Sequence, residues 1–400
     1  MNVAIMGFGT IGSGVAEVLS RNAALIEKRA GEKLVLTRVL DLRDFEGEPI
    51  APLIVHDYKE IAEDDSIDLV VETMGGVEPA YTFVKAMLLA GKSVATSNKA
   101  LVADKGAELL AIAREKRVQF QFEASVGGGI PIIRTILGCL TGDEIEEITG
   151  IINGTTNYMM TRMAQAGLDF DAALAEAQAK GYAEADPSAD IEGHDATRKI
   201  AILSSLVAEA QVDYQDISVE GISKITHQDF LYAKKLGRAV KLLAMSKRHG
   251  DTFTARVAPF LLSEEHPLYA VCDVMNAVYV VGNMLGPSMY YGSGAGSLPT
   301  ASAVVGDLVD MARNVTHPAE IRWSSQKLRL ADPKKEEFEN FLRLAMTEEE
   351  AKKLPFAVTE IVDAGVPGEV GCITEGLSEY EFEEAAEGLA DRLISRIRLA

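Results

Sequence analysis

A glycine motif near the amino terminus constrains the fold more than any other feature of this chain. Gly7-Phe8-Gly9-Thr10-Ile11-Gly12 has the spacing GxGxxG, and it follows an apolar run over 2–7 that is typical of a buried strand. Helical periodicity follows over 11–29. At such a junction the first glycine allows a tight turn, the second lets the backbone approach a pyrophosphate, and the third lets the helix pack on the strand. Glycines also occur in ordinary turns, but these flanks favour a dinucleotide-binding unit.

Strands and helices alternate through the first third of the chain. Further strands are predicted at 33–40, 68–76, 92–99 and 118–125, with helices at 79–91 and 99–117. This alternation predicts an α/β fold with a Rossmann-type, doubly wound parallel sheet. Polar and glycine-bearing loops follow several of these strands, at the sheet edge where such folds bind ligands.

The pattern changes after 126–134, and three parts are expected. Residues 1–128 form the nucleotide-binding domain, and a helix within 300–325 packs back on it. Residues 129–300 mix helices and strands, which predicts an α+β catalytic and dimerisation domain. Within 337–400 the predicted order is strand, helix, two strands, helix, strand, so the tail is expected to be a small βαββαβ region.

Charge and cysteine content exclude several classes of function. The formal net charge is −21, and a diffuse negative field repels nucleic acid and anionic membranes. The three cysteines are scattered, which argues against a disulfide framework or a structural zinc site. The start MNVAIMGFG lacks the features of a signal peptide, and no apolar run is long enough to span a bilayer. A cytoplasmic location is therefore expected.

The end of the second strand leaves the cofactor preference open. An acid there would bind the ribose diol of NAD, whereas an arginine would suit the 2′-phosphate of NADP. Both Asp41 and Arg43 are present, and Asp41 lies farther from Gly12 than the usual spacing of about 20 residues. Arg43 and Asp44 could equally belong to a solvated loop.

Residues 181–199 (GYAEADPSADIEGHDATRK) carry the strongest chemical signal. Asp195 and Lys199 are four residues apart, so they share a face of the predicted helix. The following residues, 200–210, are apolar almost all round, which predicts a buried helix. A lysine entering such a helix must be paired or have a shifted pKa. This favours a proton-transfer group oriented by a carboxylate over the alternative, a surface ion pair.

Other polar segments allow a functional and a purely structural interpretation. Lys99 ends a predicted strand, and the loop 152–157 (INGTTN) offers N–H groups and hydroxyls to a carboxylate. Residues 122–131 (FEASVGGGIP) form a hinge whose carbonyls and Glu123 could bind a hard cation. Residues 292–304 form a second glycine-rich loop that could close over a cofactor. Each of these segments could instead be an ordinary turn, hinge or crossover.

Taken together and in this order, these segments resemble homoserine dehydrogenase. The resemblance runs over about residues 1 to 325 and includes the motifs MGFGTIGSGV, ETMGGVEPA, VATSNKALVA, FEASVGGGIPII, INGTTNYM, residues 181–199 and GSGAGSLPTASAV. It implies an NAD(P)-dependent oxidoreductase that interconverts L-homoserine and L-aspartate 4-semialdehyde in threonine, methionine and isoleucine biosynthesis. Because no kinase-like segment precedes Met1, a monofunctional enzyme is expected.

The resemblance also implies roles for individual residues. Lys199 would donate the proton to the aldehyde oxygen, with Asp195 as its partner and Lys99 close to nicotinamide and substrate. Substrate binding would fall to Glu184, Tyr182, Asp190, Asp195, Gly154 and Thr155. Cofactor binding would fall to Gly7, Phe8, Gly9, Thr10, Ile11, Gly12, Arg43, Thr73, Lys99, Gly181, Glu184 and Gly296. A sodium site would use Glu123 with the carbonyls of Val126, Gly128 and Ile130.

The tail is the largest departure from the family pattern. Residues 337–400 resemble a shortened, divergent ACT-type regulatory domain, but AMTEEEAKKLPF stands where a Pro-Gly usually follows the first strand. Threonine regulation through this tail stays open. A homodimer formed by 129–300 is expected, because its apolar strands lack obvious internal cover. The alternatives are a non-catalytic NAD(P)-binding sensor and a dehydrogenase of a related amino acid.

Overall fold

The structure is a computed structural model that describes every residue of the chain except 317–319. The chain divides into two compact units. The first comprises residues 1–144, 201–215 and 290–328, and the second comprises 145–200, 216–289 and 329–400. Residues 201–215 thus group with the first unit and the tail groups with the second, whereas three separate parts were predicted from the sequence. The predicted domain boundaries stay predictions.

The first unit is built on a six-stranded parallel sheet. Its strands are β1 (Asn2–Met6), β2 (Val35–Leu40), β3 (Ile54–Val55), β4 (Ile67–Glu72), β5 (Ser93–Thr96) and β6 (Phe120–Gln121), in the order β3-β2-β1-β4-β5-β6. Every neighbouring pair runs parallel. This order, with the first strand in the middle, is that of a Rossmann fold. The predicted doubly wound sheet is therefore confirmed.

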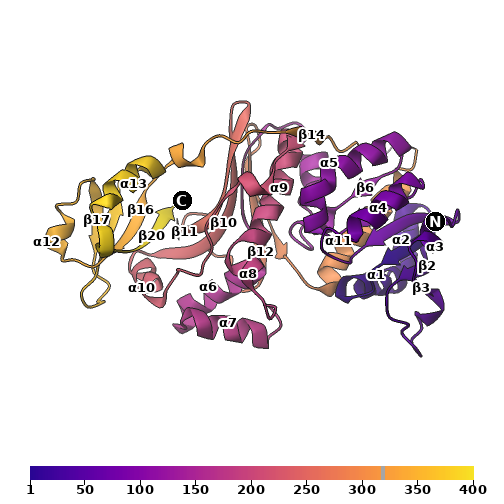
Figure 1. Cartoon of the computed structure of the whole chain (residues 1–400), viewed down its shortest axis with the longest axis horizontal. Coiled ribbons are helices and arrows are strands. Elements are labelled where there is room, and N and C mark those ends of the chain that lie inside the picture. Colours follow the sequence, from indigo (N-terminus) through magenta and orange to yellow (C-terminus); the bar gives the residue numbers. More distant parts are fainter. Residues whose placement is uncertain (317–319) are drawn as a thin grey trace. The chain divides into compact units, whose positions relative to one another are not determined.

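Helices cover this sheet in two groups (Figure 1). One group is α1 (Thr10–Arg21), α2 (Ala23–Ala30) and α11 (Ser297–Arg313), and the other is α3 (Lys59–Ala62), α4 (Ala80–Leu89) and α5 (Lys99–Lys116). Val3, Ile5 and Val15 pack with Val304 and Leu308 in one apolar core. The predicted return of a late helix to the first sheet is thus present in α11. A small sheet of β8 (Ala210–Gln211) and β14 (Ser324–Lys327) completes the unit.

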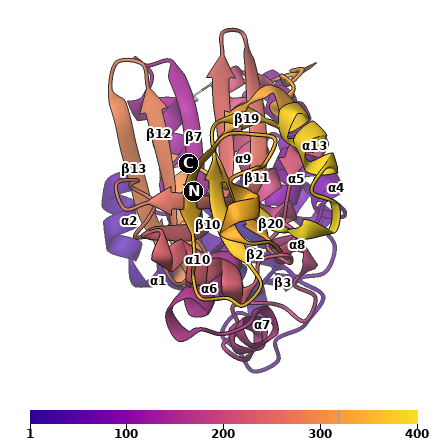
Figure 2. The same ribbon diagram turned by 90° about the vertical axis from the view of Figure 1, so that its left-hand side faces the viewer.

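A long mixed sheet forms the second unit. Its strand order is β13-β12-β7-β10-β11-β20-β16-β18-β17, and β9 pairs with β11 as well. The first strands are β7 (Ile145–Ile151), β9 (Ser218–Val219), β10 (Arg238–His249), β11 (Thr252–Ser263), β12 (Met275–Gly282) and β13 (Gly286–Ser293). Figure 2 shows β13, β12 and β7 in a row at one edge. The helices are α6 (Gly154–Ala166), α7 (Phe170–Ala179), α8 (Ser188–Ile191), α9 (His194–Ala208) and α10 (His227–Lys235), of which α9 continues into the first unit.

The tail continues this sheet. Its main elements are β16 (Asn340–Leu344), α12 (Glu348–Ala351), β17 (Val358–Val362), β18 (Val370–Thr374), α13 (Glu379–Glu387) and β20 (Leu393–Leu399), with a short pair of β15 (Glu337–Phe338) and β19 (Leu377–Ser378). The predicted βαββαβ order is present, whereas the ACT assignment stays a prediction. β20 pairs in parallel with β11 through Phe260 and Leu261, so the last strand of the chain is hydrogen-bonded to the middle of the unit.

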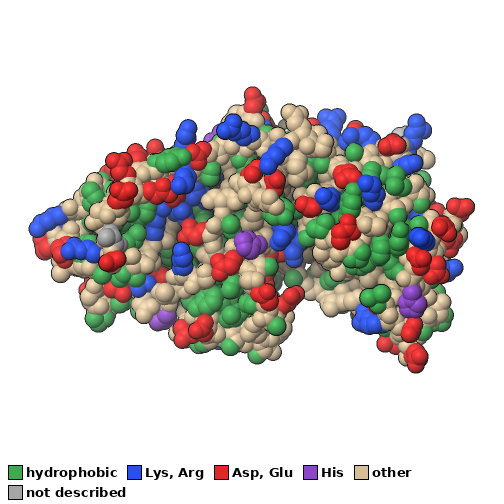
Figure 3. Space-filling model, in the orientation of Figure 1, with side chains coloured by type: hydrophobic (Ala, Val, Ile, Leu, Met, Phe, Trp, Pro, Cys, Tyr) green, Lys and Arg blue, Asp and Glu red, His purple; other side chains and the backbone are tan. Residues whose placement is uncertain are grey.

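Charges are mixed on the surface in view. On the face in Figure 3, Lys and Arg side chains lie among Asp and Glu side chains. Among the described residues, no helix is long and apolar enough to cross a membrane. The same residues contain no group of three or more His, Cys, Asp or Glu side chains arranged to hold a metal ion.

Candidate active site

The GxGxxG loop has the geometry that a bound pyrophosphate requires. Gly7 has a φ of +94°, and a Cβ there would meet Met74 at 2.8 Å. A Cβ on Gly12 would lie 2.0 Å from the carbonyl oxygen of Gly7, so only glycine lets α1 pack against the strand end. A Cβ on Gly9 would meet nothing within 4 Å, and α1 begins there without a side-chain cap. The open space and uncapped N–H groups fit an anion.

Asp41 and Arg43 meet at this loop. The Asp41 carboxylate accepts hydrogen bonds from the Phe8 N–H (2.8 Å), the Arg43 N–H (3.0 Å) and the Arg43 guanidinium (2.9 and 3.0 Å). The bond from Arg43 holds the pKa of Asp41 well below its usual range. Arg43 also donates to the Phe8 carbonyl at 2.9 Å and lies over the Phe45 ring. The Asp41 carboxylate is thus occupied by hydrogen bonds from Phe8 and Arg43, while the Arg43 side chain remains exposed.

A buried glutamate organises the carboxyl ends of β4 and β5. Glu72 is fully buried and accepts hydrogen bonds from the Thr96 hydroxyl (2.5 Å) and the Met74 N–H (2.7 Å). Burial raises its pKa. Asn98 caps α5 and donates to the Gly76 carbonyl at 2.6 Å. These bonds fix the segments after the two strands, where Thr73 follows β4 and the exposed Lys99 is the first residue of α5.

The second glycine-rich loop lies against the first within the same unit. Gly296 is the N-cap of α11 with a φ of +109°, and the adjacent Ser297 hydroxyl donates to the Thr10 carbonyl at 2.7 Å. The same loop contacts the hinge, because a Cβ on Gly128 would lie 2.5 Å from the Gly294 carbonyl. The structure therefore brings Gly296 beside the GxGxxG loop, and it packs Gly128 of the hinge against Gly294.

Glu123, the acid of the hinge, is held by hydrogen bonds within the protein. Glu123 is buried, and its carboxylate accepts from the N–H groups of Ile133 (2.8 Å) and Arg134 (2.7 Å). Burial raises its pKa despite these bonds. The Arg134 guanidinium lies 3.2 Å from both Glu123 and the fully buried Asp307. A cation at this hinge would therefore be held by backbone carbonyls, because the carboxylate oxygens already accept hydrogen bonds.

The second unit contains the buried lysine that the sequence predicted. Asp195 and Lys199 lie one turn apart in α9, with exposed fractions of 3% and 9%. The Lys199 Nζ donates to Asp195 Oδ2 and to the carbonyl of Ile152, both at 2.7 Å. This burial excludes the alternative of a solvated surface ion pair. Two of the three N–H bonds of the ammonium thus have acceptors among the described residues.

Asn153 joins two acids beside this lysine, and sequence reasoning missed it. Its Nδ2 donates to Asp190 Oδ1 at 2.7 Å and to Asp195 Oδ2 at 2.9 Å. Its Oδ1 accepts from the Thr156 N–H at 2.9 Å and so caps α6. Burial, and then the charge of Asp195, raise the pKa of Asp190. The signal was available, because an asparagine before Gly-Thr is a typical N-cap.

The remaining predicted substrate residues divide into two groups. Gly154 and Thr155 form the first turn of α6, and the Thr155 hydroxyl donates to the Tyr182 carbonyl at 2.6 Å, so these residues lie beside the cluster. Tyr182, Gly181 and Glu184 are exposed. No side chain in the described part of the chain forms a hydrogen bond with the Glu184 carboxylate. The structure brings Asp190, Asp195 and Lys199 together but leaves Glu184 outside their hydrogen bonds.

Comparisons with known proteins match this arrangement. A family model described as homoserine dehydrogenase matches residues 131–309, and one described as homoserine dehydrogenase, NAD binding domain, matches 7–123. The homoserine dehydrogenase of Bacillus subtilis is 41% identical over 319 residues, which are 79% of this chain and 73% of that protein.

Solved structures that resemble this chain belong to the same family as the matched sequences. A homoserine dehydrogenase from Thiobacillus denitrificans has a TM-score of 0.93 at 36% identity and covers 100% of this chain and 98% of that one. A hyperthermophilic archaeal homoserine dehydrogenase in complex with NADPH has a TM-score of 0.66 at 28% identity, over 80% of this chain and 99% of that one. The matched family models, the sequence relative and the solved structures lead to one conclusion: this chain belongs to the homoserine dehydrogenase family.

Proposed function

We propose that Lys199 is the proton donor in the reversible, NAD(P)-dependent reduction of L-aspartate 4-semialdehyde to L-homoserine. The observation that carries this role is the buried ammonium, fixed by Asp195 and the Ile152 carbonyl, with one N–H bond that no described residue accepts. Negative charge develops on the aldehyde oxygen as the carbon is reduced. A positioned ammonium stabilises that charge and supplies the proton, in a site where little water competes.

The first unit would hold the dinucleotide. Gly7, Gly9 and Gly12 leave room for the pyrophosphate at the start of α1, and Thr73 and Gly296 lie beside them. The cofactor, when bound, supplies the hydride to the aldehyde carbon. Lys99, on the first turn of α5, would act near the nicotinamide and the substrate. Gly181 and Glu184 are also proposed to bind the cofactor.

Asp41 and Arg43 support a preference for NADPH. The four donors already bonded to Asp41 leave its carboxylate little capacity to accept from a ribose diol. The Nη1 group of Arg43 keeps two N–H bonds that no described residue accepts, and guanidinium forks match phosphate. Arg43 is therefore proposed to bind the 2′-phosphate, in keeping with the NADPH in the archaeal relative.

The two polar ends of the substrate call for different groups. The α-carboxylate is proposed to bind the N–H groups of Gly154 and Thr155 at the positive end of α6. The α-amine is proposed to bind Glu184 and Asp190, with Tyr182 close by. Asp195 would contact the substrate while it orients Lys199. Asn153 holds Asp190 and Asp195 together for this purpose.

A sodium ion and a homodimer complete the proposal. The ion would bind the carbonyl oxygens of Glu123, Val126, Gly128 and Ile130 and rigidify the hinge. The dimer is supported by the edge strand β13 and its hairpin, where Met284, Leu285, Met289 and Tyr291 are exposed. Light scattering at micromolar concentration is expected to give twice the mass of the chain, and a monomer would contradict the dimer.

The test compares wild-type protein with Lys199→Ala and, as a matched control, Lys180→Ala. Lys180 pairs with Glu176 on the surface at 2.9 Å, so its loss removes a lysine outside the cluster. NADPH and NADH oxidation with aspartate semialdehyde is expected to fall by several orders of magnitude only in Lys199→Ala, with cofactor binding unchanged. A folded Lys199→Ala variant with full turnover would refute the role. Wild-type cofactor binding without turnover on this substrate would favour a sensor or another amino-acid substrate.

A further inference from the structure

Residues 218–222 join the main sheet to the turn between Asp190 and Asp195. We call them the brace. On one side, Ser218 and Val219 pair in parallel with β11, and the Glu220 N–H donates to the Val257 carbonyl at 2.8 Å. On the other side, the Ile222 N–H donates to the Ile191 carbonyl at 2.8 Å. The brace therefore connects a strand in the middle of the sheet to the turn at 191–193.

The contact between the brace and this turn leaves no free space. A Cβ on Gly221 would lie 2.4 Å from the Ile191 carbonyl oxygen and 2.6 Å from the Glu192 Cα, so the two backbones touch. A Cβ on Gly193 would lie 3.1 Å from Val219 and 3.2 Å from Val257. The turn is thus fixed by backbone contacts as well as by a hydrogen bond. Since Asp190 precedes this turn and Asp195 follows it, the brace sets the position of both acids.

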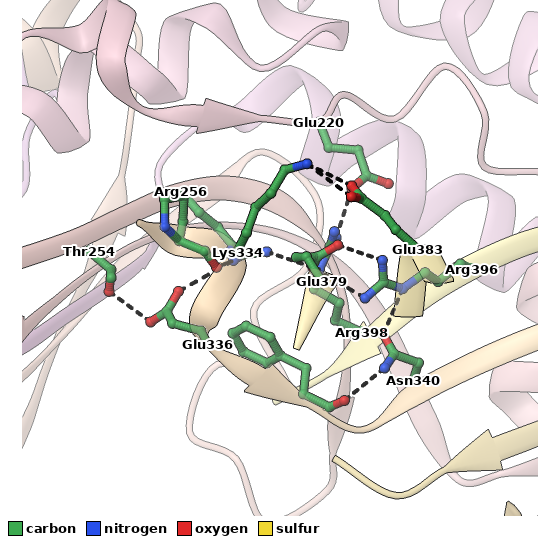
Figure 4. Close-up of polar contacts among 12 residues, drawn as sticks. Glu220, Thr254, Arg256, Lys334, Glu336, Asn340, Glu379, Glu383, Arg396 and Arg398 are labelled. Carbon is green, nitrogen blue, oxygen red and sulfur yellow. Dashed lines mark hydrogen bonds and ion pairs between the residues drawn. The ribbon is translucent and has the colours of Figure 1, made fainter. Parts of the chain in front are cut away.

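The last strand of the chain holds the brace through a charge network that is buried at Arg398 and exposed at Glu220. The Arg398 guanidinium donates to Glu220 Oε2 at 2.7 Å and to Glu379 Oε1 at 2.8 Å. Figure 4 shows Arg256, Arg396 and Arg398 converging on Glu379, with Glu220 on the other side of Arg398. Burial alone would raise the pKa of Glu379, but the bonds from Arg398 and Arg396 outweigh it and lower the pKa to about 2. The network therefore stays charged at neutral pH.

We propose that the brace, held by Arg398, is a positioning element for the dehydrogenase reaction. It fixes Asp190 and Asp195 against Asn153 and Lys199, so the carboxyl-terminal strand supports catalysis without contacting substrate. The inference rests on the proposed roles of Lys199 and Asp195. A displacement of about 1 Å in a reacting group can cost up to about 10²-fold in rate, so a small shift of this turn is measurable.

The first test is Gly221→Ala, with Gly376→Ala as the matched control. A methyl at Gly221 forces the turn at 191–192 away, whereas at Gly376 the nearest atom is 3.8 Å distant. Gly221→Ala is expected to lower kcat by about tenfold or more, with the Kd for NADPH unchanged. Gly376→Ala is expected to match wild type. A folded Gly221→Ala variant with wild-type kcat would overturn the proposal.

A second pair of variants tests the role of Arg398 if Gly221→Ala fails to fold. Glu220→Ala removes the brace's bond to the tail, while Glu383→Ala removes an exposed ion pair with Lys334 that does not touch the brace. We expect a several-fold loss of kcat only in Glu220→Ala, and recovery in Glu220→Gln, which keeps an acceptor for Arg398. Equal effects in Glu220→Ala and Glu383→Ala would overturn the proposal. Inactive wild-type enzyme would instead refute the proposed function, and the brace with it.

Discussion

Replacing Asn153 with alanine tests how the two acids are held. The substitution removes the N-cap of α6 and the hydrogen bonds to Asp190 and Asp195. Loss of an N-cap costs about 1 kcal/mol, and a hydrogen bond to a charged group contributes about 1.5 to 3 kcal/mol. The bond to Asp195 adds less, because Lys199 still donates to the same oxygen. We therefore expect the free energy of unfolding at neutral pH to fall by about 3 kcal/mol.

The loss of folding stability in Asn153→Ala should grow as the pH rises. The pKa of Asp190 is already raised above its ordinary 3.8 by burial and by Asp195, and the bond from Asn153 opposes that rise. Without Asn153 the pKa rises further, so the folded variant binds a proton that the unfolded chain releases. Its stability relative to wild type is then lost as the pH rises from the Asp190 pKa of the folded wild type, already above 3.8, through the higher pKa of the folded variant. Below both folded-state pKa values, Asp190 is protonated in the folded wild type and in the folded variant, and the pH-dependent part of the loss disappears.

Urea denaturation at several pH values between 4 and 8, followed by tryptophan fluorescence and circular dichroism, measures this effect. Thr161→Val is the matched control on the same helix, because the Thr161 hydroxyl donates to the Asn157 carbonyl and accepts from the Asp273 N–H, both uncharged groups. Its loss should be the same at every pH. The account would be wrong if Asn153→Ala lost equal stability at pH 4 and pH 7.

Three further predictions concern other charged groups. Arg43→Ala is expected to raise KM for NADPH by about tenfold, about 1.4 kcal/mol, while KM for NADH changes much less; equal increases in steady-state assays would contradict a 2′-phosphate contact. Arg343→Met leaves the buried Asp229 without its 2.9 Å ion pair, so unfolding in urea should become easier by about 3 to 5 kcal/mol. Burial raises the pKa of Asp307 well above its ordinary value. The stability of the wild-type protein therefore falls as the pH rises from the ordinary pKa of an aspartate to the raised pKa of Asp307 in the folded protein. Asp307→Asn should therefore gain Tm relative to wild type from pH 5 to pH 8, and a constant difference would count against it.

Local patterns in the sequence predicted most of the first unit. The strand–GxGxxG–helix junction and the alternation that follows it are short-range features, and the observed sheet has the predicted class. The expected helix over 11–29 is instead two helices, because Asn22 takes non-helical angles of φ −105° and ψ 17°. The predicted strand at 118–125 is shortened to β6, since a 3-10 turn begins at Glu123.

Long-range partners were not predictable in the same way. The amphipathic pattern of α9 indicated a buried Lys199, but it could not identify Ile152 and Asn153, which lie more than 40 residues away in sequence, as partners of this cluster. Asp307 bonds to the Glu123 N–H across 184 residues. The parallel pairing of β20 with β11 likewise joins distant segments, so the tail looked like a separate region from the sequence alone.

Chemical rescue of Lys199→Ala would test most directly whether this ammonium donates the proton. Removing the side chain leaves Asp195 and the Ile152 carbonyl to bind a small alkylammonium ion in its place. We predict that NADPH oxidation with aspartate semialdehyde rises with ethylammonium concentration in Lys199→Ala, and that Lys180→Ala and wild type do not respond. An inactive, cofactor-binding Lys199→Ala variant that no alkylammonium ion restores would contradict the assignment.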